Sequence, residues 1–362
     1  MLRINPHYGV NRGIPQKDRV KNGPNRTRAE GKEAFSMDFP LELRAAVERA
    51  AEEVGLPRLL DDARTLSRRY RGEERDGSRL LTRESEAAAY AAVRMPATFG
   101  AVSAALEYAA ERLPAFRPVS LLDVGAGTGA AAWAAEAVFG VESVRCLERE
   151  KAMRSWGKRL MAEGPAALRT ASFEEYDLAA GPVPGKAELV VASYVLNELP
   201  PEGRRAGAER LWAAASGMLL LVEPGTPAGY ALLREARDAL LSAGARMVAP
   251  CPHEGPCPIA GEEWCHFTCR VARSRLHRRL KEGDAPYEDE KFAYLALCRK
   301  EILPAGALPE AARVLRHPQV EKGRITLTLC APDGRKTLTV SKKDAARFRL
   351  ARKAKCGDPF PL

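Results

Sequence analysis

Leu121-Leu122-Asp123-Val124-Gly125-Ala126-Gly127-Thr128-Gly129 is the stretch that decides the fold of this 362-residue chain. A short apolar run ends in an acidic residue, and three alternating glycines then lead into an alanine-rich segment. This order predicts a β-strand, a tight turn and a helix N-terminus, which together bring backbone amides close to a nucleotide-like ligand. Glycine is needed wherever a Cβ would block the turn or the approaching ligand.

The glycine spacing also satisfies the loose dinucleotide pattern G-x-G-x-x-[GA] through Gly125, Gly127 and Ala130. The spacing by itself therefore does not identify the ligand. Gly129 extends it to D-x-G-x-G-x-G, which resembles motif I of class I S-adenosylmethionine-dependent methyltransferases. A second acid, Glu148, follows Asp123 by 25 residues and ends the next apolar run, where a carboxylate can accept hydrogen bonds from ribose hydroxyls. The resemblance therefore implies a cofactor site for S-adenosylmethionine; the alternative is the same fold with another ligand or none.

Downstream of Pro118, apolar runs alternate with helical segments, which predicts an α/β, doubly wound (Rossmann-like) sheet. Strands are expected near residues 119–124, 143–148, 168–172, 187–193, 217–223, 245–249 and 292–298, the last beside the sixth. The fourth leads into Ser193-Tyr194-Val195-Leu196-Asn197, where class I methyltransferases expose groups to the methyl donor, and Asn197 joins the expected cofactor site. No Asn-Pro-Pro-aromatic motif and no Thr-Cys pair is present here, so no catalytic residue is specified.

Four cysteines fall within 19 positions, in Cys251-Pro252-His253-Glu254-Gly255-Pro256-Cys257-Pro258 and Trp264-Cys265-His266-Phe267-Thr268-Cys269. Without an export signal, clustered cysteines indicate metal ligands rather than disulfides. Cys-Pro recurs around iron–sulfur ligands, whereas gaps of six and eight residues fit the paired knuckles of structural zinc poorly. The residues leave three interpretations of this segment open: an iron–sulfur cluster, a zinc site with His253 or His266 as a further ligand, and a loop of reduced cysteines that binds no metal.

Cys-Pro-His-x₃-Cys-Pro, then Trp-Cys-His-Phe, an arginine-rich segment and Asp-Glu-Lys-Phe-Ala-Tyr-Leu, resembles the methyltransferase-like family of small-ribosomal-subunit assembly factors. That family is known in mitochondria and has bacterial relatives, and the similarity runs from about Ala88 through the basic C-terminus. The resemblance implies a methyltransferase-like fold with a four-cysteine [4Fe–4S] cluster. Its ligands would be Cys251, Cys257, Cys265 and Cys330, the last in a Cys-x-Pro-Asp-Gly turn between two strands, with Cys269 as the local alternative for the fourth.

The formal net charge of +10 is concentrated at the two ends of the chain. Residues 313–362 carry 13 lysines and arginines against four acids, and residues 1–36 carry eight against three. Residues 270–281 add six cations without an acid and are expected to form a helix facing phosphates. This distribution indicates a polyanionic partner, and with the resemblance it implies small-subunit rRNA or the small-subunit precursor; the alternative is solubility alone. No apolar run is long enough to predict a membrane partner.

Four regions are expected: a basic flexible tail (1–36), a helical cap (37–117), a methyltransferase-like domain (118–300) with the cysteine insertion at 250–281, and a basic C-terminal β module (301–362). The function predicted is an S-adenosylmethionine-binding, methyltransferase-like protein of small-subunit maturation, monomeric off the ribosome. It would be cytoplasmic in a bacterium and mitochondrial in a eukaryote. Alternatives are a non-catalytic rRNA-binding assembly factor, a zinc-binding RNA methyltransferase, and an oxidoreductase, which the missing second redox motif disfavours.

Overall fold

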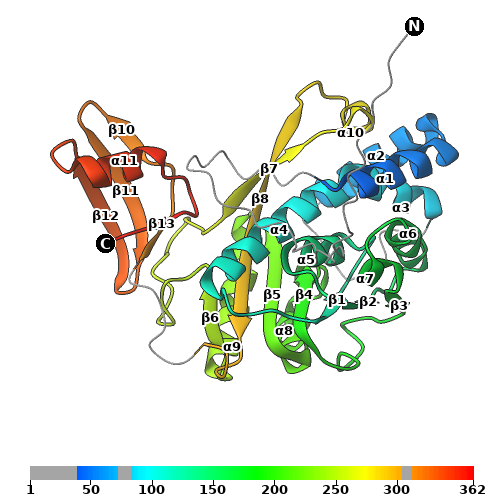
Figure 1. The fold of residues 1–362 in the computed structure, drawn as a ribbon, viewed down its shortest axis with the longest axis horizontal. Coiled ribbons are helices and arrows are strands. Elements are labelled where there is room, and N and C mark those ends of the chain that lie inside the picture. The colour runs from blue at the N-terminus through cyan, green and yellow to red at the C-terminus, as the bar shows by residue number, and fades with distance from the viewer. Residues whose placement is uncertain (1–38, 72–82, 304–310) are drawn as a thin grey trace, which may run out of the picture. The chain divides into compact units, whose positions relative to one another are not determined.

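A computed structural model describes residues 39–71, 83–303 and 311–362, so the expected tail at 1–36 lies outside the described residues. The main sheet has the strand order β3-β2-β1-β4-β5-β8-β6, and β7 adds to β8 (Figure 1). Strands β1 to β5 pair in parallel, while β8 runs antiparallel between β5 and β6. This mixed α/β architecture with a parallel central sheet confirms the predicted fold class.

The strands of the main sheet are β1 (Ser120–Val124), β2 (Ser143–Leu147), β3 (Ser172–Glu174), β4 (Ala187–Ser193), β5 (Ala215–Pro224), β6 (Arg246–Ala249), β7 (Phe267–Ala272) and β8 (Tyr287–Cys298). The helices are α1 (Leu41–Val54), α2 (Leu56–Arg71), α3 (Glu84–Val93), α4 (Met95–Arg112), α5 (Ala130–Phe139), α6 (Lys151–Met161), α7 (Ala166–Arg169), the 3-10 turn η1 (Leu196–Glu198), α8 (Pro201–Ala214), α9 (Pro227–Ser242), α10 (Arg275–Leu280) and α11 (Ala345–Lys353). None of these helices in the described part of the chain is long and apolar enough to span a bilayer.

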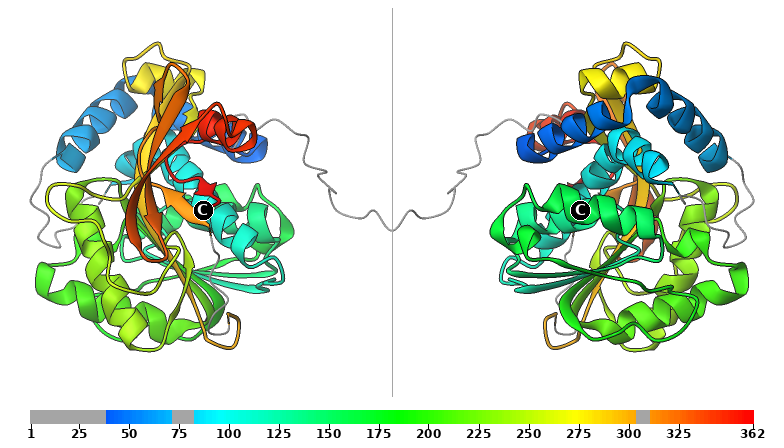
Figure 2. Two further views of the ribbon diagram at one scale, coloured as in Figure 1. Left: turned by 90° about the vertical axis from the view of Figure 1, so that its left-hand side faces the viewer. Right: turned by 90° about the vertical axis from the view of Figure 1, so that its right-hand side faces the viewer.

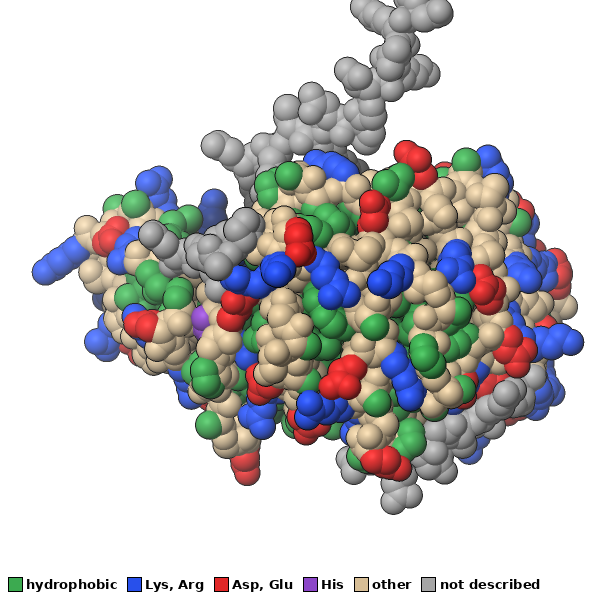
Figure 3. All heavy atoms as spheres, turned by 90° about the horizontal axis from the view of Figure 1, so that it is seen from below, with side chains coloured by type: hydrophobic (Ala, Val, Ile, Leu, Met, Phe, Trp, Pro, Cys, Tyr) green, Lys and Arg blue, Asp and Glu red, His purple; other side chains and the backbone are tan. Residues whose placement is uncertain are grey.

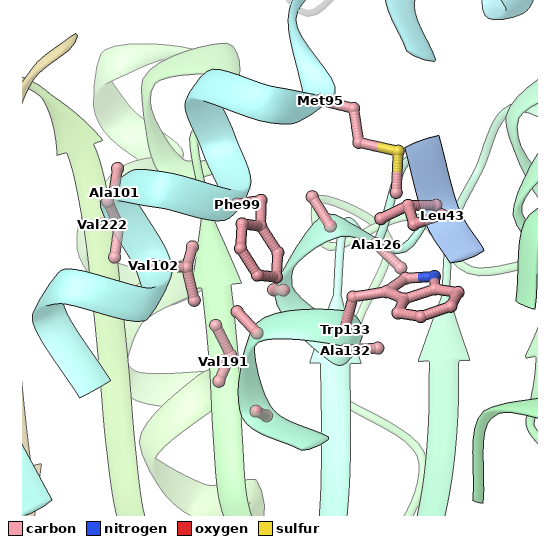
Figure 4. Packing of buried hydrophobic residues seen from close by; sticks show 14 of the residues in the cluster. Leu43, Met95, Phe99, Ala101, Val102, Ala126, Ala132, Trp133, Val191 and Val222 are labelled. Atoms are coloured by element: carbon pink, nitrogen blue, oxygen red, sulfur yellow. The ribbon is translucent and has the colours of Figure 1, made fainter. Parts of the chain in front are cut away.

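Alternation along the strands gives the sheet two apolar faces, and Figure 2 shows helices on both of them. Leu121 and Val191 pack in the core that contains α4 and α5, whereas Leu122 and Val190 pack in the core that contains α8 and α9. On the first face, Phe99 of α4 lies beside α5 and β4 (Figure 4). The buried alanines of α5 keep that helix close to the strands, so the turn before it is held rigidly against β1.

Two expected elements differ from the structure. The third strand is expected at 168–172, but the short helix α7 begins directly after Pro165, and β3 starts only at Ser172. The segment 270–281 is not one helix, because β7 continues to Ala272 and pairs with the first half of β8. Alternating burial along β7 is what a half-buried strand requires, and Ser274 then caps the six-residue helix α10.

A second sheet follows in the order β10-β11-β9-β13, with β12 paired to β11. Its strands are β9 (Ala312–Val314), β10 (Gln319–Glu321), β11 (Arg324–Ala331), β12 (Gly334–Ser341) and β13 (Pro359–Phe360). Ile325, Leu327 and Leu329 form its core, on which α11 packs. Cys330 lies inside β11, opposite Arg335, and not in the turn where the sequence placed it.

Candidate functional site

A cavity of about 1000 Å³ lies at the carboxyl ends of β1, β2, β4 and β5. The strand order reverses between β1 and β4, and such a switch point is where open α/β sheets bind ligands. Residues of α2, α3, α10 and β8 complete the wall. Of the predicted cofactor residues, Gly125, Gly127 and Glu148 line this cavity, whereas Asp123, Gly129 and Asn197 are not lining residues.

The three glycines of the turn all have positive φ, at 70°, 56° and 89°, but they serve different purposes. A Cβ on Gly125 would meet Val195 Cγ2 at 2.1 Å, and one on Gly129 would meet Met161 Cε at 2.3 Å. A Cβ on Gly127 would meet its nearest neighbour, Met153 Cε, only at 3.3 Å, and Gly127 faces the cavity. Gly125 and Gly129 therefore permit the packing of the turn, and Gly127 leaves room for a ligand.

Glu148, directly after β2, is hydrogen-bonded to the glycine turn. Its carboxylate accepts a hydrogen bond from the Gly127 amide at 2.8 Å and one from the Glu150 amide at 2.7 Å. Burial raises the pKa of Glu148, and these two amides oppose that shift. A carboxylate offers about four acceptor positions, so lone pairs remain for the hydroxyls of a ribose. The geometry therefore fits the predicted contact with a nucleoside.

Asp123 is fully buried, and within the described residues neither of its carboxylate oxygens has a hydrogen-bond partner of good geometry. Burial raises its pKa to about 7, the Ala132 amide offsets this only in part, and Glu148 adds to it. A buried carboxylate of this kind costs stability in the ligand-free protein, and such groups concentrate at functional sites.

We expect Asp123→Asn to stabilise the ligand-free protein at pH 8 but not near pH 4. Below about pH 4 the carboxyl is protonated in both the folded and the unfolded chain, while above the folded pKa of about 7 its buried charge is fully unfavourable. The gain should therefore grow between these limits, to at most about 4 kcal/mol. Thermal unfolding at pH 5 and pH 8 measures it, with the exposed Asp284→Asn as control. Equal effects at both pH values would contradict a charged Asp123.

Among the residues that line the cavity, three polar side chains from distant segments meet. Tyr194 has a φ of 60°, uncommon for a residue with a Cβ, and its hydroxyl donates to Glu290 Oε1 at 3.1 Å. Arg94 contacts the same oxygen at 3.5 Å. Tyr194 follows the fourth expected strand, and Glu290 lies within the Asp-Glu-Lys-Phe-Ala-Tyr-Leu stretch, but the sequence patterns give neither residue a role in the site.

A second, smaller cavity of about 50 Å³ is lined by Cys251, Cys257, Cys265 and Cys330. Cys269 does not line it; this thiol packs in the main core, where a Cβ on Gly100 would meet its sulfur at 3.3 Å. All four thiols of the cavity are free of disulfides. The structure thus brings together the four cysteines that the resemblance implied as ligands.

Polar groups surround these thiols. The Tyr230 hydroxyl lies 3.1 Å from Cys257 Sγ, and His253 Nε2 lies 3.4 Å from Cys330 Sγ, whereas His266 stacks on Trp264. Burial raises the pKa of Cys330 to about 12, with neighbouring thiols adding to the shift, so metal binding must displace protons. No three Cys, His, Asp or Glu side chains of the described residues are arranged to hold a single metal ion.

The strand order, the glycine turn and Glu148 define a protein with the fold of class I S-adenosylmethionine-dependent methyltransferases. Within that class, the family model described as "Mitochondrial small ribosomal subunit Rsm22" matches residues 84–361, and the chain belongs to this family.

Two relatives illustrate the family. The "Ribosome assembly protein METTL17, mitochondrial" of Homo sapiens is 31% identical over an alignment of 296 residues, and the match covers 75% of this chain and 62% of that protein. The "Rsm22-cox11 tandem protein 2, mitochondrial" of Schizosaccharomyces pombe is 28% identical over an alignment of 223 residues, and the match covers 48% of this chain and 29% of that protein. The chain therefore spans less than two thirds of the length of either relative.

Solved structures with a similar fold include methyltransferases. The magnesium protoporphyrin IX methyltransferase of Synechocystis PCC 6803 with bound SAM has a TM-score of 0.39 and 17% identity, covering 65% of this chain and 91% of that one. A putative RNA methyltransferase of Pyrococcus horikoshii has a TM-score of 0.36 and 12% identity, covering 56% and 83%.

Proposed function

We propose that this protein binds S-adenosylmethionine in the larger cavity and acts on the small ribosomal subunit precursor during its maturation. The observation that carries the cofactor assignment is Glu148, held by the Gly127 amide at the wall of a cavity at the switch point of the sheet. The carboxylate would bind the ribose hydroxyls, and the open side of Gly127 would let the ligand approach the backbone.

We also propose a [4Fe–4S] cluster with Cys251, Cys257, Cys265 and Cys330 as ligands. Support comes from the shared cavity, to which three cysteines come from the segment between β6 and β7 and the fourth comes from β11. A single zinc ion would need its donor sulfurs about 2.3 Å from one point, whereas each thiolate of a cubane binds a different iron. The cluster would link β11 to the main sheet.

The proposed partner is the small-subunit rRNA, for which family membership and the charge distribution argue together. Lys342, Lys343, Arg349, Arg352 and Lys353 are exposed on α11 and the turn before it. By contrast, acidic and basic side chains alternate on the face drawn in Figure 3, without a large area of one sign. The compartment follows the source, mitochondrial in a eukaryote, as the names of both relatives state for those proteins.

Three of the six cations of segment 270–281 already have acidic partners in the structure. Arg270 pairs with Asp289, while Arg273 and Lys281 pair with Glu288, so β8 supplies the acids that the segment itself lacks. Arg275 and Arg279 are the exposed cations of α10.

We therefore expect the replacement of Arg349, Arg352 and Lys353 by glutamine to reduce the salt dependence of RNA binding. Each lost phosphate contact should flatten the log–log slope by roughly 0.7 to 0.9, hence by about two to three units in the triple variant. Titrations with small-subunit rRNA at several salt concentrations measure the slope. Arg49→Gln with Arg205→Gln removes exposed cations that already have acidic partners, and should change it little. An unchanged slope in the triple variant would remove α11 from the interface.

A non-catalytic role as an assembly factor is the second candidate, and one observation favours it. Tyr194 and Arg94, which line the cavity, both contact the carboxylate of Glu290. Methyl transfer to an already nucleophilic atom needs only proximity and alignment, so this does not exclude catalysis. An assay with radiolabelled S-adenosylmethionine and small-subunit precursors from a deletion strain decides between the two: incorporation into rRNA by the wild type supports an enzyme.

A further inference from the structure

The wall of the four-cysteine cavity contains two buried arginines and, within the described residues, no carboxylate. Arg237 of α9 is 2% exposed and Arg313 of β9 is 8% exposed. Burying a cation is costly unless an anion or a full set of hydrogen bonds compensates it. The hydrogen-bond and ion-pair partners of these two guanidinium groups therefore indicate whether the cavity needs an anion to compensate their charge.

Arg237 is only partly compensated. One terminal nitrogen contacts the carboxylate of Asp238 at 2.8 Å, but this acid is exposed, where ion pairs contribute little. The other terminal nitrogen donates to the carbonyl oxygens of His253 at 3.1 Å and Gly255 at 2.7 Å, within the cysteine loop. Its buried Nε has no hydrogen-bond partner of good geometry within the described residues.

Arg313 donates from Nε to the Pro250 carbonyl at 3.1 Å and from a terminal nitrogen to the Gly357 carbonyl at 2.6 Å. Its guanidinium also lies over the Tyr108 ring, 5.7 Å from the centroid. No Asp or Glu of the described residues forms an ion pair with it. Both guanidiniums act electrostatically on the thiols of Cys251 and Cys330.

We propose that Arg237 and Arg313 are the counter-charges of an anionic metal–thiolate centre, and that they set the reduction potential of the cluster. This inference rests on the proposed function. Four thiolates around a [4Fe–4S]²⁺ core carry a net charge of −2, which two guanidinium groups balance. Addition of one electron leaves the centre at −3, so loss of an arginine disfavours the reduced state more than the oxidised one.

The test is a redox titration of the anaerobically purified full-length protein, after its iron, sulfide and zinc have been counted. Arg237→Gln and Arg313→Gln should each move the midpoint potential to more negative values, while Arg237→Lys and Arg313→Lys should stay near the wild type. Arg234→Gln is the matched control, because Arg234 also lines the cavity but is exposed. Glutamine variants with a full cluster and an unshifted potential overturn the proposal.

Variants that lose the cluster are also informative. If the glutamine variants lose iron and the lysine variants keep it, charge is what the site requires, as proposed. If lysine fails as badly as glutamine, the arginines act through their hydrogen bonds, and the proposal is wrong. The metal content of the wild type tests the proposed function separately. Zinc in place of iron refutes the cluster and overturns the role of the arginines in setting its reduction potential. Protein with neither metal overturns both.

Discussion

Replacing Cys330 with serine is expected to remove nearly all the iron from the anaerobically purified protein. Wild-type protein should be brown and contain about four irons and four sulfides per chain. Cys330 lines the cavity together with Cys251, Cys257 and Cys265, so its loss leaves one iron without its thiolate. Absorbance near 400 nm and chemical iron analysis measure the result.

Cys269→Ser is the matched control for this experiment. Cys269 is buried in the main core on β7 and does not line the cavity, so the variant should keep its colour even if it is somewhat less stable. Bleaching by Cys269→Ser with retention in Cys330→Ser would reverse the assignment of the fourth ligand. Stoichiometric zinc in colourless wild-type protein would contradict the cluster itself.

Cys330→Ser should also weaken the connection between two parts of the chain. Cys330 is part of β11 in the second sheet, whereas Cys251, Cys257 and Cys265 belong to the segment between β6 and β7. A cluster bound by all four would cross-link these parts of the chain. Loss of iron should therefore speed limited proteolysis of the chain, with the fragments identified by mass spectrometry.

The second large effect is expected at Gly127, where valine should abolish binding of S-adenosylmethionine. The added side chain would project into the cavity and occupy the space of the ligand, and a φ of 56° also strains any residue with a Cβ. Calorimetry with the cofactor and its demethylated product measures the loss.

Gly140→Val separates lost ligand space from backbone strain. Gly140 has a φ of 66° at the end of α5, and a Cβ added there would meet nothing within 4 Å, so valine carries similar strain away from the cavity. This variant should bind the cofactor like the wild type.

Glu148→Gln should weaken binding of the cofactor by about 1–3 kcal/mol, because a neutral amide is a poorer partner for the ribose hydroxyls. Absence of wild-type affinity for either ligand would refute the cofactor site.

Most of the main fold was predictable from local sequence. The strand that contains Asp123, the glycine turn and the buried alanines of α5 are adjacent in the chain, and their chemistry leaves few other conformations. Short elements were predicted less well. The third strand was misplaced because Ala166–Arg169 has good helical propensity and follows a proline. The strand β7 was mistaken for part of a helix because its arginines make the alternation of buried and exposed positions difficult to recognise in the sequence.

Some residues of the candidate site were also predictable from the sequence, and others were not. Gly127 and Glu148 were identifiable because each ends or follows a predicted strand, and parallel strands bring their carboxyl ends to one edge. Tyr194 and Glu290 meet only because β8 runs antiparallel beside β5, and its first half extends past the end of that strand to the cavity. No spacing in the sequence encodes such a meeting.

The sequence by itself determined the fold class, the glycine turn and a set of candidate cysteines, since each depends on neighbouring residues. The family resemblance implied Cys330 and local spacing offered Cys269, and the tertiary structure brings Cys330 to the cavity of Cys251. Only the tertiary structure buried Arg237 and Arg313 around the same cavity. The reason is physical. Contacts between distant segments follow from strand order and from the packing of two separate sheets, and these minimise the free energy of the whole chain rather than of any one stretch of it.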